Sequence, residues 1–241
     1  MNHSSQSNRS QPAFLLLHGF GGAPWEVEPL AEALRKRGYL VAAPTIKGLS
    51  SSSRRDMARY AYEEWIWAAE EAYKALKTQS DKIVLAGFST GGLIAVHLAI
   101  RHNPEAIIFM STPIQHWDLK RIMTNLGEDI KNRRPDHLRY YMKSTVKFPV
   151  RALWEFKRIQ RHTKSRFGEV RCPALILQGL DDDTVHHQSA ACILKGLHSI
   201  KSHSKAELEY FEPAGHVLLQ GPARDQALRR ILKFLGDSCI L

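Results

Sequence analysis

One serine of this chain lies in a pattern that is typical of an enzyme nucleophile. Ser89 is the central residue of a G-x-S-x-G motif that runs from Gly87 to Gly91. An apolar segment of strand type precedes the motif at residues 82–86, and an apolar segment of helix length follows it at residues 92–100. A strand, a sharp turn and a helix are the context in which this motif presents a serine hydroxyl above a sheet. The pattern therefore predicts nucleophilic chemistry at Ser89.

A serine hydroxyl is a weak nucleophile at neutral pH, so this prediction requires a base and an acid that orients the base. After a motif of this kind the acid comes next in the chain and the histidine last. An acidic turn of Asp181, Asp182 and Asp183 follows a predicted strand, and all three carboxylates are candidates for the acid. His216 lies between the last predicted strand and the last predicted helix. The sequence therefore predicts His216 as the base.

The negative charge that forms on a reacting carbonyl requires two N–H donors, the oxyanion hole. One donor is predicted at Thr90, which directly follows the nucleophile. The other is predicted at Phe20, in the glycine-rich loop of residues 18–22 after the first predicted strand. Glycines suit this loop because its backbone must pass close to the substrate. His18, in the same loop, is predicted to support the loop and not to act as the base.

Alternating strands and helices position these residues. The predicted strands cover residues 13–18, 39–43, 82–86, 106–110, 174–178 and 208–211. The predicted helices between and after them cover residues 25–37, 61–76, 92–100 and 223–235. This alternation is typical of β-α-β units and indicates an α/β protein with a mostly parallel sheet flanked by helices.

One interval breaks the alternation after the fourth predicted strand. Between residues 113 and 171 no buried strand is predicted, and residues 119–130 and 150–159 have helical patterns bounded by prolines. An insertion at the carboxyl ends of parallel strands lies over the active-site edge, so we expect a small helical cap or lid. The predicted organisation is a disordered tail without a secretory signal over residues 1–12, a core over residues 13–112 and 172–241, and the cap over residues 113–171.

Composition indicates an ordinary globular protein. The chain has 241 residues, of which 44% are hydrophobic and 24% are charged, and this balance is sufficient for a buried core. No apolar run approaches the roughly 18 residues of a membrane span. Cys172, Cys192 and Cys239 are odd in number and lack the spacing of a metal site. Reduced thiols in a cytoplasmic protein are the simplest interpretation, and neither a metal nor a cofactor is expected.

The positive charge of the chain is concentrated in the insertion. The net charge is +10, and the segment 116–171 contains fifteen basic and six acidic residues. A solvated basic face is the favoured interpretation. Attraction to an anionic substrate or a weak contact with an anionic surface stays open as an alternative. Nucleic acid is not expected as a partner, because no helix-turn-helix, zinc or aromatic RNA motif is present.

Several segments resemble the small bacterial carboxylesterases and monoacylglycerol lipases of the α/β-hydrolase superfamily. The segments that carry the resemblance are residues 15–22, 47–48, 86–92, 172–176 and 215–217. In that group the spacing G-x-x-D-x-x-V favours Asp182 as the acid, and the oxyanion donors correspond to Phe20 and Thr90. The resemblance also implies a helical cap in the insertion. The segment Gly48-Leu49-Ser50 departs from the Gly-His-Gly that members of this group often have.

The expected activity is hydrolysis of short- to medium-chain acyl esters or monoacylglycerols through an acyl-enzyme on Ser89. The same residues would also serve a thioesterase, an acyltransferase or a peptidase, because the substrate pocket determines the function. A non-catalytic binding protein on this fold is the alternative from another class. Some apolar residues of the insertion are candidates for an acyl pocket or for ordinary packing: Ile122, Met123, Leu126, Trp154 and Phe156.

Overall fold

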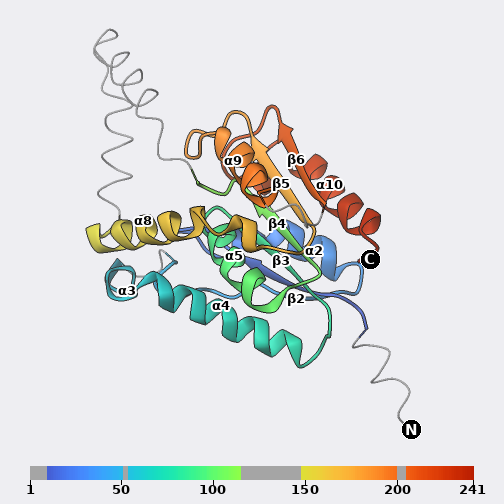
Figure 1. The fold of residues 1–241 in the computed structure, drawn as a ribbon, viewed down its shortest axis with the longest axis horizontal. Helices are drawn as coiled ribbons and strands as arrows, with labels where there is room; N and C mark the ends of the chain where they lie inside the picture. The colour runs from blue at the N-terminus through green and yellow to red at the C-terminus, as the bar shows by residue number, and fades with distance from the viewer. Residues whose placement is uncertain (1–9, 51–53, 115–147, 200–204) are drawn as a thin grey trace.

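Six parallel strands form one sheet at the centre of the computed structural model, which describes residues 10–50, 54–114, 148–199 and 205–241 (Figure 1). The strand order is β2-β1-β3-β4-β5-β6. The strands are β1 (Ala13–Leu17), β2 (Leu40–Ala42), β3 (Ile83–Phe88), β4 (Ala106–Met110), β5 (Ala174–Gly179) and β6 (Ala206–Phe211). All neighbouring strands are parallel, with Leu15 of β1 opposite Leu85 of β3 and Phe109 of β4 opposite Ile176 of β5.

The four inner strands are buried along their whole length, whereas the edge strands β2 and β6 are partly exposed. Continuous apolar runs are expected where helices cover both faces of a parallel sheet. Because adjacent side chains of a strand point to opposite faces, the residues of β1 alternate between two separate hydrophobic clusters. The core is therefore two apolar layers with the sheet between them.

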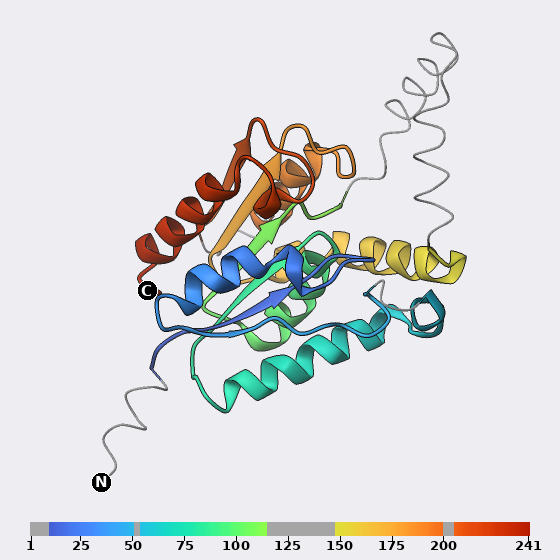
Figure 2. The same cartoon turned by 180° about the vertical axis from the view of Figure 1, so that it is seen from behind.

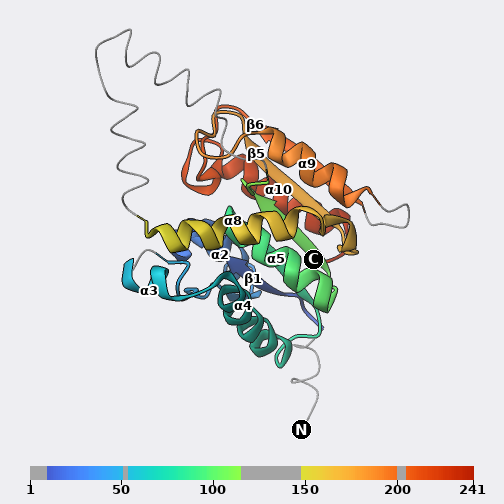
Figure 3. The ribbon, with the colours of Figure 1, turned by 60° about the vertical axis from the view of Figure 1, so that its left-hand side comes forward.

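Helices cover both faces of the sheet. One face carries α4 (Tyr62–Lys77), α5 (Thr90–His102) and α9 (Gln188–Leu197) (Figure 1). The opposite face carries α2 (Glu28–Arg35) and α10 (Arg224–Asp237), which come forward when the molecule is seen from behind (Figure 2). The helix α8 (Val150–Lys164) lies across α5, and it also contacts α4 and the short helix α3 (Arg54–Arg59) (Figure 3).

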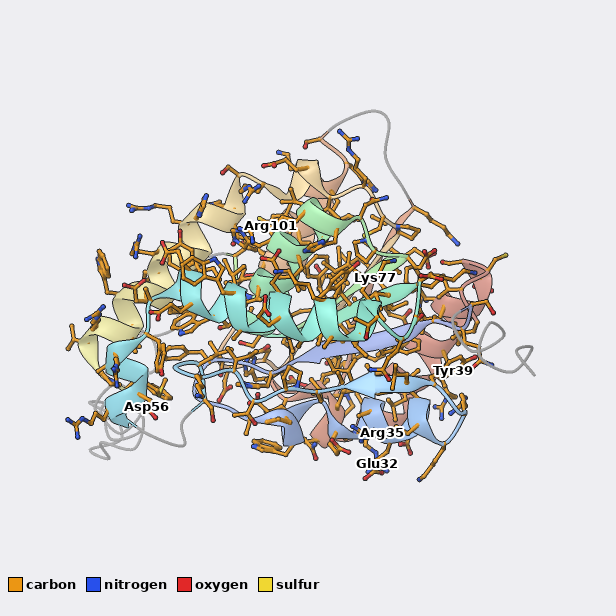
Figure 4. All side chains as sticks on the ribbon, turned by 90° about the horizontal axis from the view of Figure 1, so that it is seen from below. Glu32, Arg35, Tyr39, Asp56, Lys77 and Arg101 are labelled. Atoms are coloured by element: carbon orange, nitrogen blue, oxygen red, sulfur yellow. The ribbon has the colours of Figure 1, made fainter. Side chains whose placement is uncertain are left out.

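The outer helices are amphipathic. In α2, Leu30, Ala31 and Leu34 are fully buried against the sheet, whereas Glu32 and Arg35 point away from it (Figure 4). This spacing is that of a helix with one apolar face. None of the described helices is long and apolar enough to cross a membrane.

All six predicted strands are confirmed, with each end within two residues of its predicted position. The single helix predicted over residues 25–37 is wrong: a short η1 turn (Pro24–Glu26) comes first, and α2 then begins at Glu28. Pro29 explains the break, because it has no N–H to donate to the Trp25 carbonyl of a continuous helix. That carbonyl instead accepts a hydrogen bond from the Gln220 side chain at 2.8 Å.

Two helices, α3 and α9, were not expected from the sequence. The helix predicted over residues 150–159 is confirmed and continues to Lys164. The helix predicted over residues 119–130 lies outside the described residues, as do Ile122, Met123 and Leu126 and the first nine residues of the predicted tail.

Candidate active site

The turn between β3 and α5 places Ser89 in a backbone conformation that few residues adopt. Ser89 has φ 50° and ψ −121°, and its exposed fraction is 8%. A Cβ atom on Gly87 would lie 2.3 Å from the Gly92 nitrogen, and one on Gly91 would lie 2.2 Å from the Leu17 carbonyl oxygen. Both distances are too short for a side chain, so only glycine fits on either side of the serine. Such local strain is characteristic of active sites.

Neighbouring strands fix the position of this turn. The Ser89 N–H donates to the Met110 carbonyl at the end of β4, at 2.8 Å. Thr90 is the first residue of α5, and the first N–H groups of a helix have no acceptor within the helix. The helix dipole adds a partial positive charge at the same point. The Thr90 N–H is therefore suited to bind an oxyanion.

The loop of residues 18–22 lies against the serine turn. A Cβ atom on Gly19 would lie 3.1 Å from the Ser89 Cβ. The N–H groups of Gly19, Gly21 and Gly22 all have acceptors, at 2.8, 2.7 and 3.2 Å. Within the described part of the chain, the N–H of Phe20 makes no hydrogen bond, so it can donate to a substrate. This is the arrangement that the predicted oxyanion hole requires.

His18 supports the loop from below and is fully buried. The Ile46 N–H donates to its Nε2 at 3.0 Å, so the ring proton is on Nδ1, which donates to the Gly19 carbonyl at 2.9 Å. Burial lowers the pKa of His18, and the hydrogen bond to Gly19 offsets this only in part. Both ring nitrogens are thus occupied, which agrees with the prediction that His18 is not the base.

The Asp182 carboxylate and the His216 imidazole meet above the ends of β5 and β6. Asp182 Oδ2 lies 2.9 Å from His216 Nδ1, and Gln178 Nε2 donates to the same oxygen at 2.9 Å. The backbone N–H groups of Thr184 and Val185 donate to Oδ1 at 2.9 and 2.8 Å. Because an ionised carboxylate only accepts, the His216 proton lies on Nδ1, and Nε2 is the nitrogen that can take up a proton.

Asp182 remains charged although it is buried. Burial raises the pKa of its carboxyl, but hydrogen bonds from His216 and from the backbone of Val185 and Thr184 outweigh this effect. The pKa of Asp182 therefore lies below its ordinary value. A charged carboxylate is the form that orients a histidine and stabilises its protonated state.

The structure distinguishes the three neighbouring aspartates. Asp182 is buried and faces His216, whereas Asp181 and Asp183 are exposed. The Asp181 carboxylate accepts the Ala214 N–H at 3.1 Å and so fixes the loop that carries the histidine. Asp183 accepts a hydrogen bond from the Thr184 hydroxyl at 3.0 Å. Only Asp182 of the three is placed to orient His216, and its catalytic role stays a prediction.

His216 lies at the same edge of the sheet as the serine turn. Its ring centroid is 4.9 Å from that of Phe88, the residue directly before Ser89. Ser111 follows β4 with φ 49°, and its hydroxyl donates to the His216 carbonyl at 2.9 Å. The Ser111 N–H donates to the Leu177 carbonyl of β5, also at 2.9 Å. The predicted nucleophile, acid and base thus come from three strand ends at one edge.

An aromatic cluster covers the loop of residues 18–22, which is called the oxyanion loop below because the predicted donor Phe20 lies in it. The Phe20 ring lies 5.0 Å from Phe148, 5.5 Å from Phe156 and 6.0 Å from Trp65, measured between centroids. A Cβ atom on Gly21 would lie 2.3 Å from the Phe148 ring. Phe156 was a predicted candidate for the acyl pocket. Its contact with Phe20 places it next to the site.

Three residues around the site carry no prediction from the sequence: Ser111, Gln178 and Glu26, whose Oε2 accepts the Gly19 N–H at 2.8 Å. Ser111 and Gln178 are polar residues at the ends of apolar strands, and this position is a signal that could have identified them. Glu26 has no such signal, because a glutamate near a helix start is common.

Trp154, a predicted pocket candidate, is 58% exposed on α8.

A parallel sheet, a strained serine between strand and helix, and an Asp–His pair at the same edge define the class of α/β-hydrolases. The comparison with known families agrees. The model of the family described as "Serine aminopeptidase, S33" matches residues 8–222. The chain belongs to this family, and it is a hydrolase.

Two curated relatives are named as a lipase and a carboxylesterase. A thermostable monoacylglycerol lipase of Bacillus sp. (strain H-257) is 31% identical over 219 residues, which cover 83% of this chain and 85% of that protein. A carboxylesterase of Bacillus subtilis (strain 168) is 24% identical over 231 residues, which cover 92% of each protein. The predicted resemblance to the carboxylesterase and monoacylglycerol lipase group is confirmed.

Solved structures show the same fold. A structure from work on the metagenome-derived lipolytic enzymes LipS and LipT has a TM-score of 0.77 and 20% identity, covering 95% of this chain and 94% of that chain. The monoacylglycerol lipase of Paleococcus ferrophilus has a TM-score of 0.66 and 17% identity, covering 95% and 96%. The α/β-hydrolase fold predicted from the sequence is confirmed.

Proposed function

We propose that this protein hydrolyses short- to medium-chain acyl esters or monoacylglycerols through an acyl-enzyme on Ser89. The observation that carries the proposal is the 2.9 Å contact between Asp182 and His216 at the sheet edge that also bears the strained serine. The family membership and the named activities of the relatives support the same chemistry.

In the first step the Ser89 hydroxyl attacks the ester carbonyl while His216 Nε2 takes its proton. The N–H groups of Phe20 and Thr90 donate to the oxyanion of the tetrahedral intermediate. The bond to the leaving alcohol then breaks, and the protonated His216 gives its proton to the alcohol oxygen. Asp182 keeps the imidazole oriented and stabilises its positive charge.

In the second step a water molecule attacks the acyl-enzyme, and His216 takes the proton of the water. The same N–H groups stabilise the second tetrahedral intermediate. Its collapse releases the carboxylic acid and returns the proton to Ser89. The proposed reaction uses no cofactor and no metal.

Two variants test the roles of these residues. Ser89→Ala is expected to abolish turnover of p-nitrophenyl esters and labelling by a fluorophosphonate probe, because both need the hydroxyl. Asp183→Asn is the matched control, since it removes an exposed carboxylate next to the proposed acid. Undiminished ester turnover by Ser89→Ala would end the proposal. Absence of labelling in the wild-type protein would favour the non-catalytic binding protein.

A substrate panel separates esterase from related activities. A peptidase is the second candidate function, because the family is described by the name serine aminopeptidase. Thioesterases and acyltransferases would use the same residues. The panel compares p-nitrophenyl esters, monoacylglycerols, acyl thioesters and aminoacyl p-nitroanilides. The highest kcat/KM is expected for the esters or monoacylglycerols, and a preference for the anilides would assign a peptidase.

The insertion is part of the proposal as a cap over residues 113–171, with the core over residues 13–112 and 172–241. Its described portion supports this division, because α8 packs on α5 and the residue pair Phe148 and Phe156 contacts the oxyanion loop. Limited proteolysis at increasing ester concentration tests the cap. Protection within the insertion is expected, and unchanged cleavage there would contradict a lid.

A weak contact of the cap with an anionic surface stays part of the proposal. On α8, Val150 is 83% exposed and Trp154 is 58% exposed, and basic residues such as Arg151 and Arg161 lie on the same helix. Sedimentation with anionic and with zwitterionic vesicles tests this contact. Binding only to the anionic vesicles, lost at high salt, is the expected result.

We also infer a cytoplasmic location. The three cysteines form no disulfide bond in the described structure, and burial raises the pKa of the Cys172 thiol to about 12, which makes it unreactive. Fractionation of the source cells is the test, and recovery in a secreted fraction would contradict the inference.

A further inference from the structure

Glu26 is a buried carboxylate that the proposed reaction does not use. It ends the η1 turn, and its exposed fraction is 8%. Its Oε2 accepts the Gly19 N–H at 2.8 Å. A Cβ atom on Gly22 would lie 2.1 Å from the same oxygen, so the carboxylate rests directly against the loop backbone. The loop of residues 18–22 therefore wraps around a buried carboxyl group.

The segment that carries Glu26 also packs on the segment that carries His216. Gln220, four residues after the histidine, donates to the Trp25 carbonyl at 2.8 Å. Burial raises the pKa of the Glu26 carboxyl above its ordinary value, and hydrogen bonds from the loop backbone and the positive charge of His216 offset this only in part. The Gln220 hydrogen bond thus ties the segment of the Glu26 carboxyl to the segment of the His216 imidazole.

We propose that Glu26 is a positioning residue, which fixes the oxyanion loop through Gly19 and adds a second negative charge beside His216. This inference rests on the proposed function, because it assigns a role within the same reaction. The contacts of Gly19 support the first half, the fixing of the loop. The contact between the Glu26 segment and the His216 segment supports the second half, the effect of charge.

The first half follows from the planarity of the peptide bond. The carbonyl of Gly19 and the N–H of Phe20 belong to one rigid peptide plane and point in opposite directions. His18 Nδ1 and the Gly22 N–H both donate to that carbonyl, at 2.9 and 3.2 Å. Glu26 binds the N–H of the preceding peptide plane, which meets the first plane at the Gly19 Cα. One plane is held at its carbonyl and its neighbour is held by Glu26, so the Phe20 N–H keeps its direction before the substrate arrives.

The second half follows from electrostatics. His216 becomes positively charged when it takes the proton of the nucleophile, and nearby negative charge favours this state. Asp182 supplies one such charge through direct contact. Glu26 supplies the other without a hydrogen bond to the ring, so its effect on the histidine is one of charge and not of orientation.

Two substitutions of Glu26 separate its effect on the loop from its effect through charge. Glu26→Leu removes both the acceptor and the charge, whereas Glu26→Gln keeps an oxygen that accepts the Gly19 N–H. For Glu26→Leu we expect kcat to fall about 10- to 100-fold, part of the 10²–10³ that loss of a whole oxyanion donor costs. We expect KM to stay within about twofold, because the donor acts in the transition state. Glu26→Gln is expected to recover most of kcat.

The pH profile measures the charge. The acidic limb of kcat/KM reports the pKa of the base in the free enzyme. Loss of a negative charge disfavours the protonated imidazole, so in Glu26→Gln this limb should move to lower pH by about 0.5 to 1 unit. The matched control is Glu64→Gln, since the Glu64 carboxylate also accepts a backbone N–H, that of Ala61 at 2.8 Å, at the start of α4.

The Glu26 variants are measured only after the wild-type enzyme has turned over the ester and labelled with a fluorophosphonate. Failure of the proposed function would appear in that first measurement, so it is distinct from failure of the role of Glu26. Each variant is compared at equal labelled concentration, which corrects for any unfolded protein. Equal kcat for Glu26→Leu, Glu26→Gln and wild type would overturn the positioning role. An acidic limb that stays in place in Glu26→Gln, or that moves equally in Glu64→Gln, would overturn the electrostatic role.

Discussion

His97 is buried as a neutral imidazole between α5 and α8, and this makes the stability of the protein sensitive to acid. Its exposed fraction is 2%. The Thr163 hydroxyl donates to the Ile159 carbonyl at 2.8 Å, so it accepts the proton of His97 Nε2 at 2.9 Å. Arg166 donates to His97 Nδ1 at 3.2 Å. Both ring nitrogens are satisfied only while the ring is neutral.

The surroundings oppose a second proton on this ring. Burial lowers the pKa of His97 from 6.5 to about 3, and the positive charge of Arg166 acts in the same direction. His162, whose ring centroid lies 5.3 Å away, and Arg101 also lower the pKa, and Glu169 raises it in part. The folded protein therefore keeps His97 neutral at a pH where an unfolded chain would protonate it.

The size of the effect follows from the two pKa values. Between pH 6.5 and pH 3 the unfolded chain binds a proton at His97 that the folded chain does not bind, so the free energy of unfolding decreases as the pH falls. At pH 5 the difference from pH 8 amounts to about 2 kcal/mol, taking about 1.4 kcal/mol for each pH unit below 6.5. This is a large part of the 5–15 kcal/mol that is usual for a domain.

The test is the substitution His97→Gln. The glutamine amide can donate to Thr163 and accept from Arg166 as the neutral ring does, but it takes up no proton. Urea unfolding followed by tryptophan fluorescence gives the free energy of unfolding at pH 8 and at pH 5. Between these values the wild-type protein is expected to lose about 2 kcal/mol more than the variant. His198→Gln, which replaces an exposed histidine at the end of α9, should behave as the wild type.

Equal losses in the wild type and in His97→Gln would refute this reasoning, because the histidine would then not be the group that responds to acid. Greater loss in the variant would refute it as well.

Three further predictions concern the site. Asp182→Asn removes the charge that orients His216, so kcat should fall about 10⁴-fold with an unchanged circular dichroism spectrum; a loss below tenfold would argue against the role. Gly87→Ala forces a Cβ to 2.3 Å from backbone, and we expect a loss of about 3 kcal/mol in urea unfolding, which an unchanged midpoint would contradict. Phe148→Ala opens space beside Phe20, so the ratio of kcat/KM for dodecanoyl to butanoyl p-nitrophenyl esters should rise; a constant ratio would show that this ring does not limit the acyl chain.

The four inner strands could be predicted from the sequence because their apolar runs are nearly continuous, as burial on both faces requires. The helix α9 could not be predicted in the same way. Gly196 near its end disfavours a helix, and its reason is tertiary: a Cβ there would lie 2.8 Å from the Phe167 Cβ. A sequence pattern does not show a contact between residues so far apart.

The site shows the same division between local and distant information. The motif around Ser89 was visible because strand, turn and helix are contiguous in the chain. The choice among three aspartates stayed open on the residues alone, since burial and the direction of the Asp182 carboxylate depend on β5, β6 and the His216 loop. The contact of Glu26 with Gly19 cannot be predicted, because Gly19 lies in a loop whose shape depends on its tertiary contacts.

The strand order has a mechanical consequence. The serine turn and the oxyanion loop follow β3 and β1, while Asp182 and His216 follow β5 and β6, so the pairing of β4 with β5 joins the two halves of the site. Ser111 spans this junction, with its N–H on Leu177 and its hydroxyl on the His216 carbonyl. Gln220 adds a second link between the two halves through the Trp25 carbonyl. The alignment of the proposed nucleophile with its base therefore depends on contacts that involve neither side chain.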